Sequence, residues 1–334
     1  MRAVVLHTLG GPDVLKLEEA PDPRPDPGEV VVRLRAAALN HRDVWVRTGR
    51  YANIKLPLIL GSDGAGEVEG TGPGVDAAWR GRRILIDPAF NWGEDERAQS
   101  AAFQILGMPR DGTYAQLVRA PADHLYEIPA HLSFEEAAAV PLASVTAFRA
   151  LVIRAQLSAA DTLVVTGIGG GVATCCLLMG ATLGARVYVT SGSDAKIQAA
   201  MAHGAAAGVN HSNPEWPRAL ISLIGGRPDV VVDGAGGETF NHALDVVKPG
   251  GRVVSYGATL GPAKNLEVRR IFWKQLDVLG STMGTARDFA AMLRLYDAGM
   301  RPIVDSVLPL EQAAEAHRRM EEGRQFGKIV LKIP

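Results

Sequence analysis

The clearest chemical signal in this sequence is a glycine cluster that follows a short apolar stretch, residues 163–165. The cluster comprises Gly167, Gly169, Gly170, Gly171 and Val172. Glycines let a backbone approach a pyrophosphate closely, and the free N–H groups at the start of a helix attract its charge. The spacing does not fit G-x-G-x-x-G cleanly, because Val172 stands at the third position counted from Gly167. The order strand, loop, helix and second strand nevertheless favours a dinucleotide site over a plain tight turn.

The residues after the second strand, expected over 186–190, bear on which dinucleotide would bind. An Asp or Glu at this place would hydrogen-bond the ribose 2′-hydroxyl of NAD, whereas a 2′-phosphate would be repelled by it. The sequence offers Ser191, Ser193 and Lys196 instead, which predicts NADP(H). Asp194 is acidic, but its place at the start of the next helix predicts an N-cap. The alternative is that the two serines and the lysine form a solvated turn.

Two further strand ends supply candidate cofactor contacts, because ligands gather at the carboxyl ends of parallel strands. Gly257 and Ala258 follow the strand expected over 252–256. Ser281 and Met283 lie at the end of the next strand. For Met283, plain packing is an equal alternative.

The elements that must position these residues change in character along the chain. Up to about residue 120, short alternating strands are interrupted by Gly and Pro, the pattern of a small β-barrel. From residue 133, strands alternate with amphipathic helices, which is typical of a parallel sheet built from βαβ units. The strands of the first part are expected over 14–18, 29–37, 66–69, 83–87 and 114–118. Those of the second part are expected over 162–166, 187–190, 229–232, 252–256 and 278–281, with helices over 196–203 and 240–247.

The end of the chain is predicted to return to strand and helix after that sheet. The expected order is a helix over 288–298, a strand over 306–308, a helix over 310–322 and a strand over 328–333.

Composition excludes several classes of protein. With 334 residues, of which 47% are apolar, a large core is available, and the length favours two domains. The 35 Lys and Arg balance 36 Asp and Glu without a basic block, so nucleic acid is not expected as a partner. No apolar run reaches the length of a membrane span, and the start of the chain does not read as a signal peptide. Adjacent Cys175 and Cys176 make no disulfide framework, which predicts a cytoplasmic protein.

Several short motifs in combination resemble those of the medium-chain dehydrogenases/reductases, in particular the zinc-free, quinone oxidoreductase-like branch. The matching stretches are residues 36–43, 47–51, 61–68, 112–115, 141–148, 166–173 and 326–330, so the resemblance spans essentially the whole chain. It implies an α/β fold with a GroES-like β-barrel domain and a Rossmann domain built on a doubly wound parallel sheet. The implied boundaries are 1–120 with 288–334 for the first domain and 121–287 for the second, with the cofactor cleft between them.

The departures from the zinc-bearing relatives predict that no metal is bound. Those enzymes place a Cys where Asn40 stands, a His-Glu pair where Ser62 and Asp63 stand, and a further ligand near Leu142. Tetrahedral zinc prefers thiolate and imidazole ligands, which are missing here. Residues 91–100 also lack the four cysteines of a structural zinc site, and residues 89–110 are expected to form a flexible lobe or a lid.

Without a Lewis acid, the easiest hydride acceptors are already activated: quinones and α,β-unsaturated carbonyls. The resemblance implies that Asn40 and Asp43 face the nicotinamide, that Tyr51 lies near the acceptor's oxygen, and that Thr146, expected at a helix start, contacts the ribose or phosphate. Asp43 could instead start a helix or pair with a nearby arginine, and Tyr51 could be a surface aromatic of the barrel.

Two other functions stay open for this sequence. One is an enoyl reductase of acyl thioesters, which should need a basic patch that Arg47, Arg50 and Arg110 neither make nor exclude. The other is an NADPH-binding protein with little turnover. In each case the expected partners are a small molecule and a second copy of the chain, as a homodimer or tetramer paired through the strand near 278–281.

Overall fold

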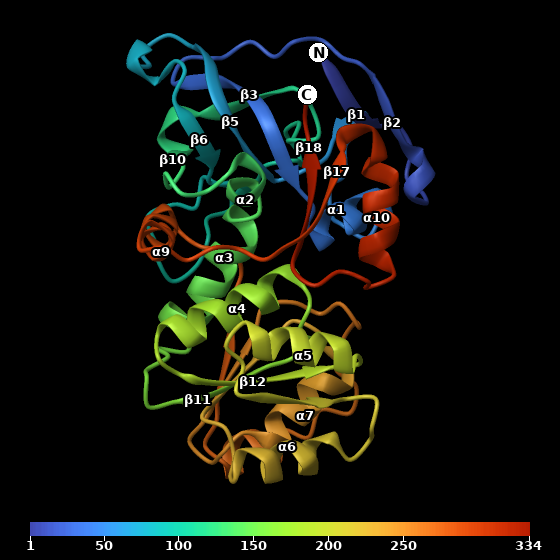
Figure 1. The fold of residues 1–334 in the computed structure, drawn as a ribbon, viewed down its shortest axis with the longest axis vertical. Helices are drawn as coiled ribbons and strands as arrows, with labels where there is room; N and C mark the ends of the chain where they lie inside the picture. The colour runs from blue at the N-terminus through green and yellow to red at the C-terminus, as the bar shows by residue number, and fades with distance from the viewer. The chain divides into compact units, whose positions relative to one another are not determined.

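The computed structural model describes residues 1–334, which divide into two compact units. The first comprises Met1–Ala143 and Thr285–Pro334, and the second comprises Ser144–Gly284 (Figure 1). The division falls at residues 143 and 284 rather than at the expected 120 and 287. The first boundary is displaced because the chain beyond residue 120 still adds a strand, Leu125–Glu127, to the sheet of the first unit.

The first unit is built on a seven-stranded sheet in the order β10–β6–β5–β3–β18–β17, with β9 also paired to β3. Its strands are β3 (Glu29–Ala38), β5 (Asp63–Thr71), β6 (Arg83–Ile86), β9 (Leu117–Pro121), β10 (Leu125–Glu127), β17 (Val304–Pro309) and β18 (Lys328–Lys332). β3 is almost wholly buried because it is paired along both edges: β5 lies on one side, and β9 and then β18 on the other. The pairing of β18 with the end of β3 brings the last residues of the chain beside the segment that follows β3.

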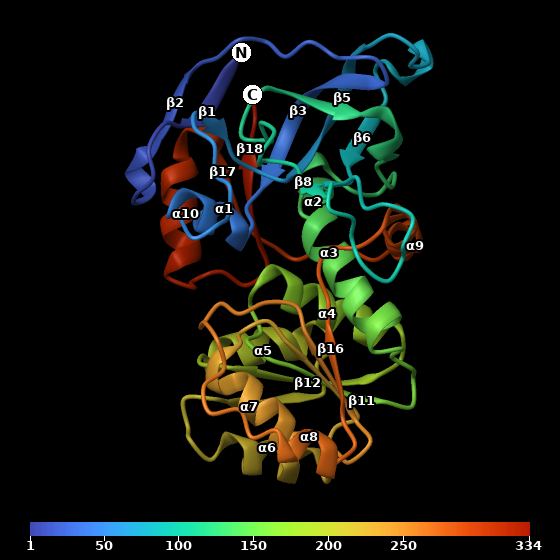
Figure 2. The same ribbon diagram turned by 180° about the vertical axis from the view of Figure 1, so that it is seen from behind.

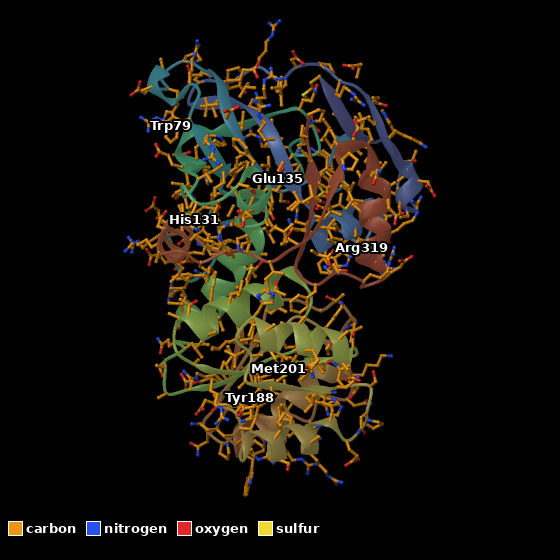
Figure 3. The ribbon with its side chains drawn as sticks, in the orientation of Figure 1. Trp79, His131, Glu135, Tyr188, Met201 and Arg319 are labelled. Carbon is orange, nitrogen blue, oxygen red and sulfur yellow. The ribbon has the colours of Figure 1, made fainter.

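A smaller sheet and several helices complete this unit. The sheet has the order β2–β1–β4, with β1 (Arg2–Leu6), β2 (Leu15–Glu19) and β4 (Leu58–Ile59). The helices are α1 (His41–Arg47), α2 (Phe134–Ala138), α9 (Ala286–Asp297) and α10 (Ala313–Glu321), and α3 (Pro141–Phe148) begins here and continues into the second unit. Arg319 of α10 (Figure 3) donates from Nε to Asp305 of β17 at 2.8 Å, which joins this helix to the edge strand.

Residues 89–110, expected as a flexible lobe or a lid, fold back on themselves. Two short strands, β7 (Ala89–Phe90) and β8 (Gln104–Ile105), pair at the base. The rings of Trp92 and Phe103 stack edge to face with centroids 5.4 Å apart, and Trp92 is 6% exposed. Aromatic packing therefore organises this segment.

The second unit is a six-stranded parallel sheet in the order β13–β12–β11–β14–β15–β16. Its strands are β11 (Thr162–Val165), β12 (Arg186–Ser191), β13 (Ala207–Asn210), β14 (Val230–Asp233), β15 (Arg252–Ser255) and β16 (Asp277–Gly280). Helices α4 (Gly171–Thr182) and α5 (Asp194–Ala202) cover one face, and α6 (Trp216–Ile224), α7 (Gly237–Val246) and α8 (Arg269–Trp273) cover the other (Figures 1 and 2). The expected doubly wound sheet is confirmed.

The interior of this sheet explains why its strands are nearly continuous apolar runs. Val164 of β11, Tyr188 of β12 (Figure 3) and Val231 of β14 pack against Trp216 and Leu220 of α6. Both faces of each central strand are covered, so neither face needs polar residues. The order of the strands reverses between β11 and β14, and ligands of such sheets bind at the carboxyl ends there. No helix in the chain combines the length and the apolar character needed to cross a bilayer.

Candidate functional site

The loop between β11 and α4 has the geometry of an anion site. Gly167 and Gly169 adopt φ angles of 62° and 120°, which side chains disfavour. Gly170, the N-cap residue of α4, places no side chain over the helix start, and a Cβ added there would meet no atom within 4 Å. The first N–H groups of α4, beginning with Gly171 and Val172, are therefore open to a ligand. This cradle fits the pyrophosphate of a dinucleotide.

The loop is held against the strand beside it. Ile168 donates its N–H to the Thr190 carbonyl oxygen at 2.8 Å, and Gly167 donates to Thr190 Oγ1 at 3.3 Å. Ser191, 4% exposed, donates from Oγ to the Ile168 carbonyl at 3.5 Å. The structure thus brings the predicted pyrophosphate loop and the predicted 2′-phosphate turn together at one edge of the sheet.

The turn after β12 differs in one respect from the sequence prediction. Ser193, not Asp194, is the N-cap residue of α5. Asp194 accepts a hydrogen bond from Asn210 Nδ2 at 2.8 Å, so its carboxylate is tied to the end of β13. The Ser193 N–H donates to Ser191 Oγ at 3.2 Å, and Lys196 lies half-buried in the first turn of α5.

His211 is a residue of this turn that the sequence analysis missed. Its N–H donates to the Ser191 carbonyl at 2.9 Å, and a Cβ added to Gly192 would lie 3.3 Å from His211 Nε2. Burial lowers the pKa of this imidazole. The available signal was indirect: a further parallel strand beside β12 must end at the same edge, and β13 was not recognised.

The ends of β14 and β15 lie at the same edge of the sheet, since the two strands pair in parallel. Thr166 donates from Oγ1 to Asp233 Oδ1 at 2.5 Å, and Asp233 Oδ2 accepts the Gly236 N–H at 2.9 Å. Burial raises the pKa of the Asp233 carboxyl. Gly257 lies so close to β14 that an added Cβ would be 3.0 Å from the Gly234 carbonyl oxygen, and Ala258 packs against Gly236.

Three more predicted residues lie in the second unit. Thr146 is in the second half of α3, not at a helix start as expected, and donates from Oγ1 to the sulfur of Met283 at 3.9 Å. Met283 is 3% exposed and has a φ of 44°. Ser281 follows β16, and its buried hydroxyl has no hydrogen-bond partner. The structure therefore pairs Thr146 with Met283 and leaves the Ser281 hydroxyl without a partner.

In the first unit, Asn40 is at the centre of a buried polar group. It follows β3 and precedes α1. Its Oδ1 accepts from Lys328 Nζ at 2.7 Å, and its Nδ2 donates to Asp63 Oδ2 at 2.9 Å. Lys328 also donates to Asp63 Oδ2 at 2.9 Å, and the side chains of this ion pair are 3% and 0% exposed.

Asp43, in the first turn of α1, accepts a hydrogen bond from the backbone of Asn40 and so fixes its position. Asp43 Oδ2 accepts the Asn40 N–H at 2.9 Å and the Tyr114 hydroxyl at 3.0 Å. The carboxyl is fully buried, and burial raises its pKa although the Arg42 charge opposes the shift. Asp43 makes no direct ion pair with Arg42 or Arg47, so of its two alternatives the helix-start role is the one that the geometry displays.

Tyr51 is not hydrogen-bonded to this group. It is half-buried against the barrel core, with the Arg42 guanidinium 5.3 Å from its ring centroid. Arg42 in turn donates to Ser62 Oγ at 2.7 Å and to the Leu106 carbonyl at 2.9 Å. No hydrogen bond connects Tyr51 with Asn40 or Asp43.

The residues 1–334 contain no group of three or more His, Cys, Asp or Glu side chains that could hold a metal ion.

Lys328 is a site residue that the sequence did not indicate. It stood there only as part of the motif at residues 326–330. Its role beside Asn40 could not be found by local spacing, because the pairing of β18 with β3 is what brings the two together.

A barrel of GroES type followed by a Rossmann sheet with an open glycine loop defines a class of nicotinamide-dependent oxidoreductases. Residues 26–130 match the model of the alcohol dehydrogenase GroES-like domain, and residues 167–298 match the model named zinc-binding dehydrogenase. The chain belongs to the medium-chain dehydrogenase/reductase superfamily, whose members bind nicotinamide cofactors. The resemblance to this superfamily, stated from the motifs, is confirmed.

Relatives of this chain carry several different names. It is 33% identical over 339 residues to the zinc-type alcohol dehydrogenase-like protein YogA of Leptosphaeria maculans, covering 96% of this chain and 94% of that protein. It is 28% identical to the quinone oxidoreductase of Mus musculus, covering 100% of this chain and 98% of that protein.

Solved structures agree with this assignment. A crystal structure of an NAD-dependent alcohol dehydrogenase matches with a TM-score of 0.95 and 41% identity, covering 100% of both chains. Mycobacterial Rv1454c complexed with NADPH matches with a TM-score of 0.86 and 26% identity, covering 99% of this chain and 100% of that one.

Proposed function

We propose that this protein is an NADPH-dependent oxidoreductase that transfers hydride to a quinone or an α,β-unsaturated carbonyl without using a metal. The observation that supports it best is the group around Asn40. The Lys328 ammonium already supplies positive charge there, hydrogen-bonded to an amide oxygen and a carboxylate oxygen at 2.7 and 2.9 Å. It would repel a divalent cation, and the group offers neither thiolate nor imidazole to bind one.

A bound nicotinamide supplies the hydride in this reaction. The protein's own residues bind and orient the reactants. The N–H groups of Gly171 and Val172 hold the pyrophosphate, and residues of the first unit meet the acceptor. Asn40 donates an N–H to the acceptor's oxygen, Asp43 positions the Asn40 backbone, and Tyr51 is a second donor for the same oxygen.

NADPH is proposed over NADH because of the turn after β12. Ser193 has a hydroxyl that caps no helix N–H, Ser191 lies beside it, and Lys196 follows in the first turn of α5. His211 adds a ring nitrogen at the same place. The only acid in the turn, Asp194, stands in the first turn of α5 rather than at the end of β12, and its Oδ1 accepts from Asn210 at the end of β13. Thr146, Gly257, Ala258, Ser281 and Met283 are proposed to contact the rest of the cofactor.

Self-association as a homodimer, or as a tetramer, is part of the proposal. β16 is the last strand of the sheet and pairs only with β15, so one edge of its backbone is unpaired. Pairing with the same strand of a second copy would satisfy that edge in both chains.

One set of assays tests the proposed activity. NADPH and NADH are each titrated into the protein, and oxidation of the bound cofactor is then followed with a panel of quinones and enones. Primary and secondary alcohols are offered in parallel with NAD⁺ or NADP⁺, with and without a chelator. We expect turnover of quinones or enones that the chelator leaves unchanged. Alcohol oxidation that the chelator abolishes would contradict the proposal.

A further inference from the structure

The carboxamide of Asn40 is held in one orientation by opposite charges on its two sides. Its oxygen faces the Lys328 ammonium at 2.7 Å, and its nitrogen faces the Asp63 carboxylate at 2.9 Å. Reversing the amide would place an N–H against an ammonium and an oxygen against a carboxylate, which are two repulsive contacts. The orientation follows from the charges and not from packing alone.

The hydrogen bonds around this group can be counted completely. Lys328 has three N–H donors, and all are used: on Asn40 Oδ1, on Asp63 Oδ2 and on the Leu39 carbonyl at 2.8 Å. The second Asp63 oxygen accepts the Leu142 N–H at 2.8 Å. Asn40 Nδ2 has two hydrogens, of which Asp63 takes one. One N–H of Asn40 is therefore left for a ligand, whereas Lys328 has none to give.

A hydrogen bond from an ammonium to an amide oxygen also withdraws electron density from the amide nitrogen. Bonds in such a chain strengthen one another, so the remaining N–H becomes a better donor. The surroundings enhance this effect, because Lys328 and Asp63 are almost completely buried and water cannot screen their charges.

We propose that Lys328 and Asp63 are positioning residues that lock and polarise the Asn40 amide, so that its free N–H stabilises the negative charge developing on the oxygen of the hydride acceptor. This inference rests on the proposed reduction of a carbonyl-bearing acceptor. Lys328 thereby supplies, through Asn40, electrostatic assistance at the acceptor's oxygen. Asn40 is the group that touches the substrate, and Lys328 acts only through it.

A double-mutant cycle between Asn40 and Lys328 tests this relation. Asn40→Ala should lower kcat by about 100- to 1,000-fold, as loss of one such donor does in other enzymes. Lys328→Met should lower kcat by about 10- to 100-fold, while the affinity for NADPH stays unchanged. The double variant should be no slower than Asn40→Ala alone, because the lysine then has nothing to act on. Losses that multiply in the double variant would show that Lys328 is only structural and would overturn the inference.

Lys274→Met is the matched control. Lys274 also donates to backbone carbonyl oxygens, those of Leu244 at 2.8 Å and Asp245 at 2.7 Å, but it lies in the second unit. Its loss should lower stability without lowering kcat. Lys328→Met alone leaves the buried Asp63 carboxylate without a countercharge, which can prevent folding, so the variant Asp63→Asn/Lys328→Met is made beside it. That variant should lose at least as much kcat as Lys328→Met, because it removes both charges that hold the Asn40 amide, and wild-type kcat in it would overturn the inference.

A spectroscopic measurement separates this inference from the proposed function. The side-chain amide signals of Asn40, identified by their loss in Asn40→Ala, are followed by NMR with ¹⁵N labelling. Removing the Lys328 charge should shift these signals, whereas Lys274→Met should leave them in place. If the wild type reduces neither quinones nor enones, the proposed function fails. The change in the Asn40 signals still tests whether Lys328 holds the Asn40 amide. Unchanged Asn40 signals in the Lys328 variants would overturn the lock whatever the activity.

Discussion

Lys196 and Ser191 decide the cofactor preference at the scale of single residues, if the turn after β12 holds a 2′-phosphate. Lys196→Ala should weaken NADPH binding by about 1.5–3 kcal/mol, the worth of a charge-assisted hydrogen bond, which is roughly ten- to a hundredfold. NADH binding should stay nearly unchanged. Binding of both cofactors is measured at one fixed salt concentration, because surface charges are screened. Equal affinities of the wild type for NADH and NADPH would contradict the assignment.

Ser191→Asp should go further and reverse the preference. A carboxylate at this place repels the phosphate of NADPH and offers the ribose of NADH a new acceptor. The same titrations measure it, and the matched control is Ser222→Asp, which adds a carboxylate at an exposed position of α6, on the other face of the sheet from α5. A Ser191→Asp variant that weakens both cofactors equally would show that the substitution only damages the turn.

The Asn40 group also predicts the metal content of the purified protein. Since Lys328 and Asp63 already form an ion pair there, we expect less than stoichiometric zinc. Elemental analysis after dialysis measures this directly. About one tightly held zinc per chain would show that the ammonium is displaced or that another site exists.

These residues differ in how far the sequence could predict them. The loop at Gly167 and Gly169 could be predicted because its glycines stand close together in the sequence, between a strand and a helix. The Lys328–Asn40 contact could not be found in this way, since 288 positions separate the two residues and only the β18–β3 pairing joins them. The helix start was misjudged by one position, since Ser193 is the N-cap residue of α5, and the contact of Asp194 with Asn210 could not be predicted because β13 was not recognised.

At the scale of elements, a buried chain of hydrogen bonds joins α10 to α1. Arg47 Nε donates to His317 Nδ1 at 3.3 Å, so His317 carries its hydrogen on Nε2, which lies 3.5 Å from the Tyr114 hydroxyl. Tyr114 donates onward to Asp43. Burial, and then the Arg47 charge, lower the pKa of His317 to about 3. The helix pair is thus built around a neutral histidine.

This histidine makes stability depend on pH in a defined direction. Its pKa in the folded state lies below the ordinary value of 6.5, so the unfolded chain takes up a proton first as the pH falls. The contribution to stability is fully present above about pH 6.5 and is lost toward pH 3, by about 1.4 kcal/mol per pH unit. Urea unfolding of wild type and His317→Gln should therefore show the wild type losing about 3 kcal/mol more between pH 7.5 and 4.5. Parallel losses in the two proteins would contradict this assignment.

Elements were predicted best where their pattern is local. The strands of the Rossmann sheet read as apolar runs because both faces are covered, and α9 and α10 read as amphipathic helices. β13 was missed because Ala207–Asn210 is short, half-buried and contains Gly208. An added Cβ at Gly208 would lie 2.7 Å from Val189 and 2.8 Å from Ile197, so the strand is defined by close packing of its neighbours. Such packing leaves no periodic signal in the sequence.

At the scale of the whole molecule, the return of the C-terminal segment to the first unit is what completes the Asn40 group. β18 closes the barrel sheet beside β3 and places Lys328 next to Asn40 and Asp63. The discontinuous domain was expected from the family motifs alone, since nothing in composition or periodicity says where a returning strand will pair. The chemical consequence of that pairing became visible only with the structure.

The free edge of the second unit predicts how two copies associate. β16 pairs only with β15, Val278 on it is 39% exposed, and the preceding helix α8 leaves Phe272 and Trp273 62% and 83% exposed. An apolar, unpaired edge is covered when the same strand of a second copy pairs with it.

Val278→Lys should therefore shift the protein from dimer to monomer at micromolar concentration, because a lysine on each paired edge adds like charges and opposes strand addition. Sedimentation velocity measures this, with Val307→Lys as the matched control, since Val307 is 46% exposed on β17, an edge strand of the sheet in the first unit. A wild type that stays monomeric would contradict the predicted assembly, and dissociation by Val307→Lys alone would place the interface on β17.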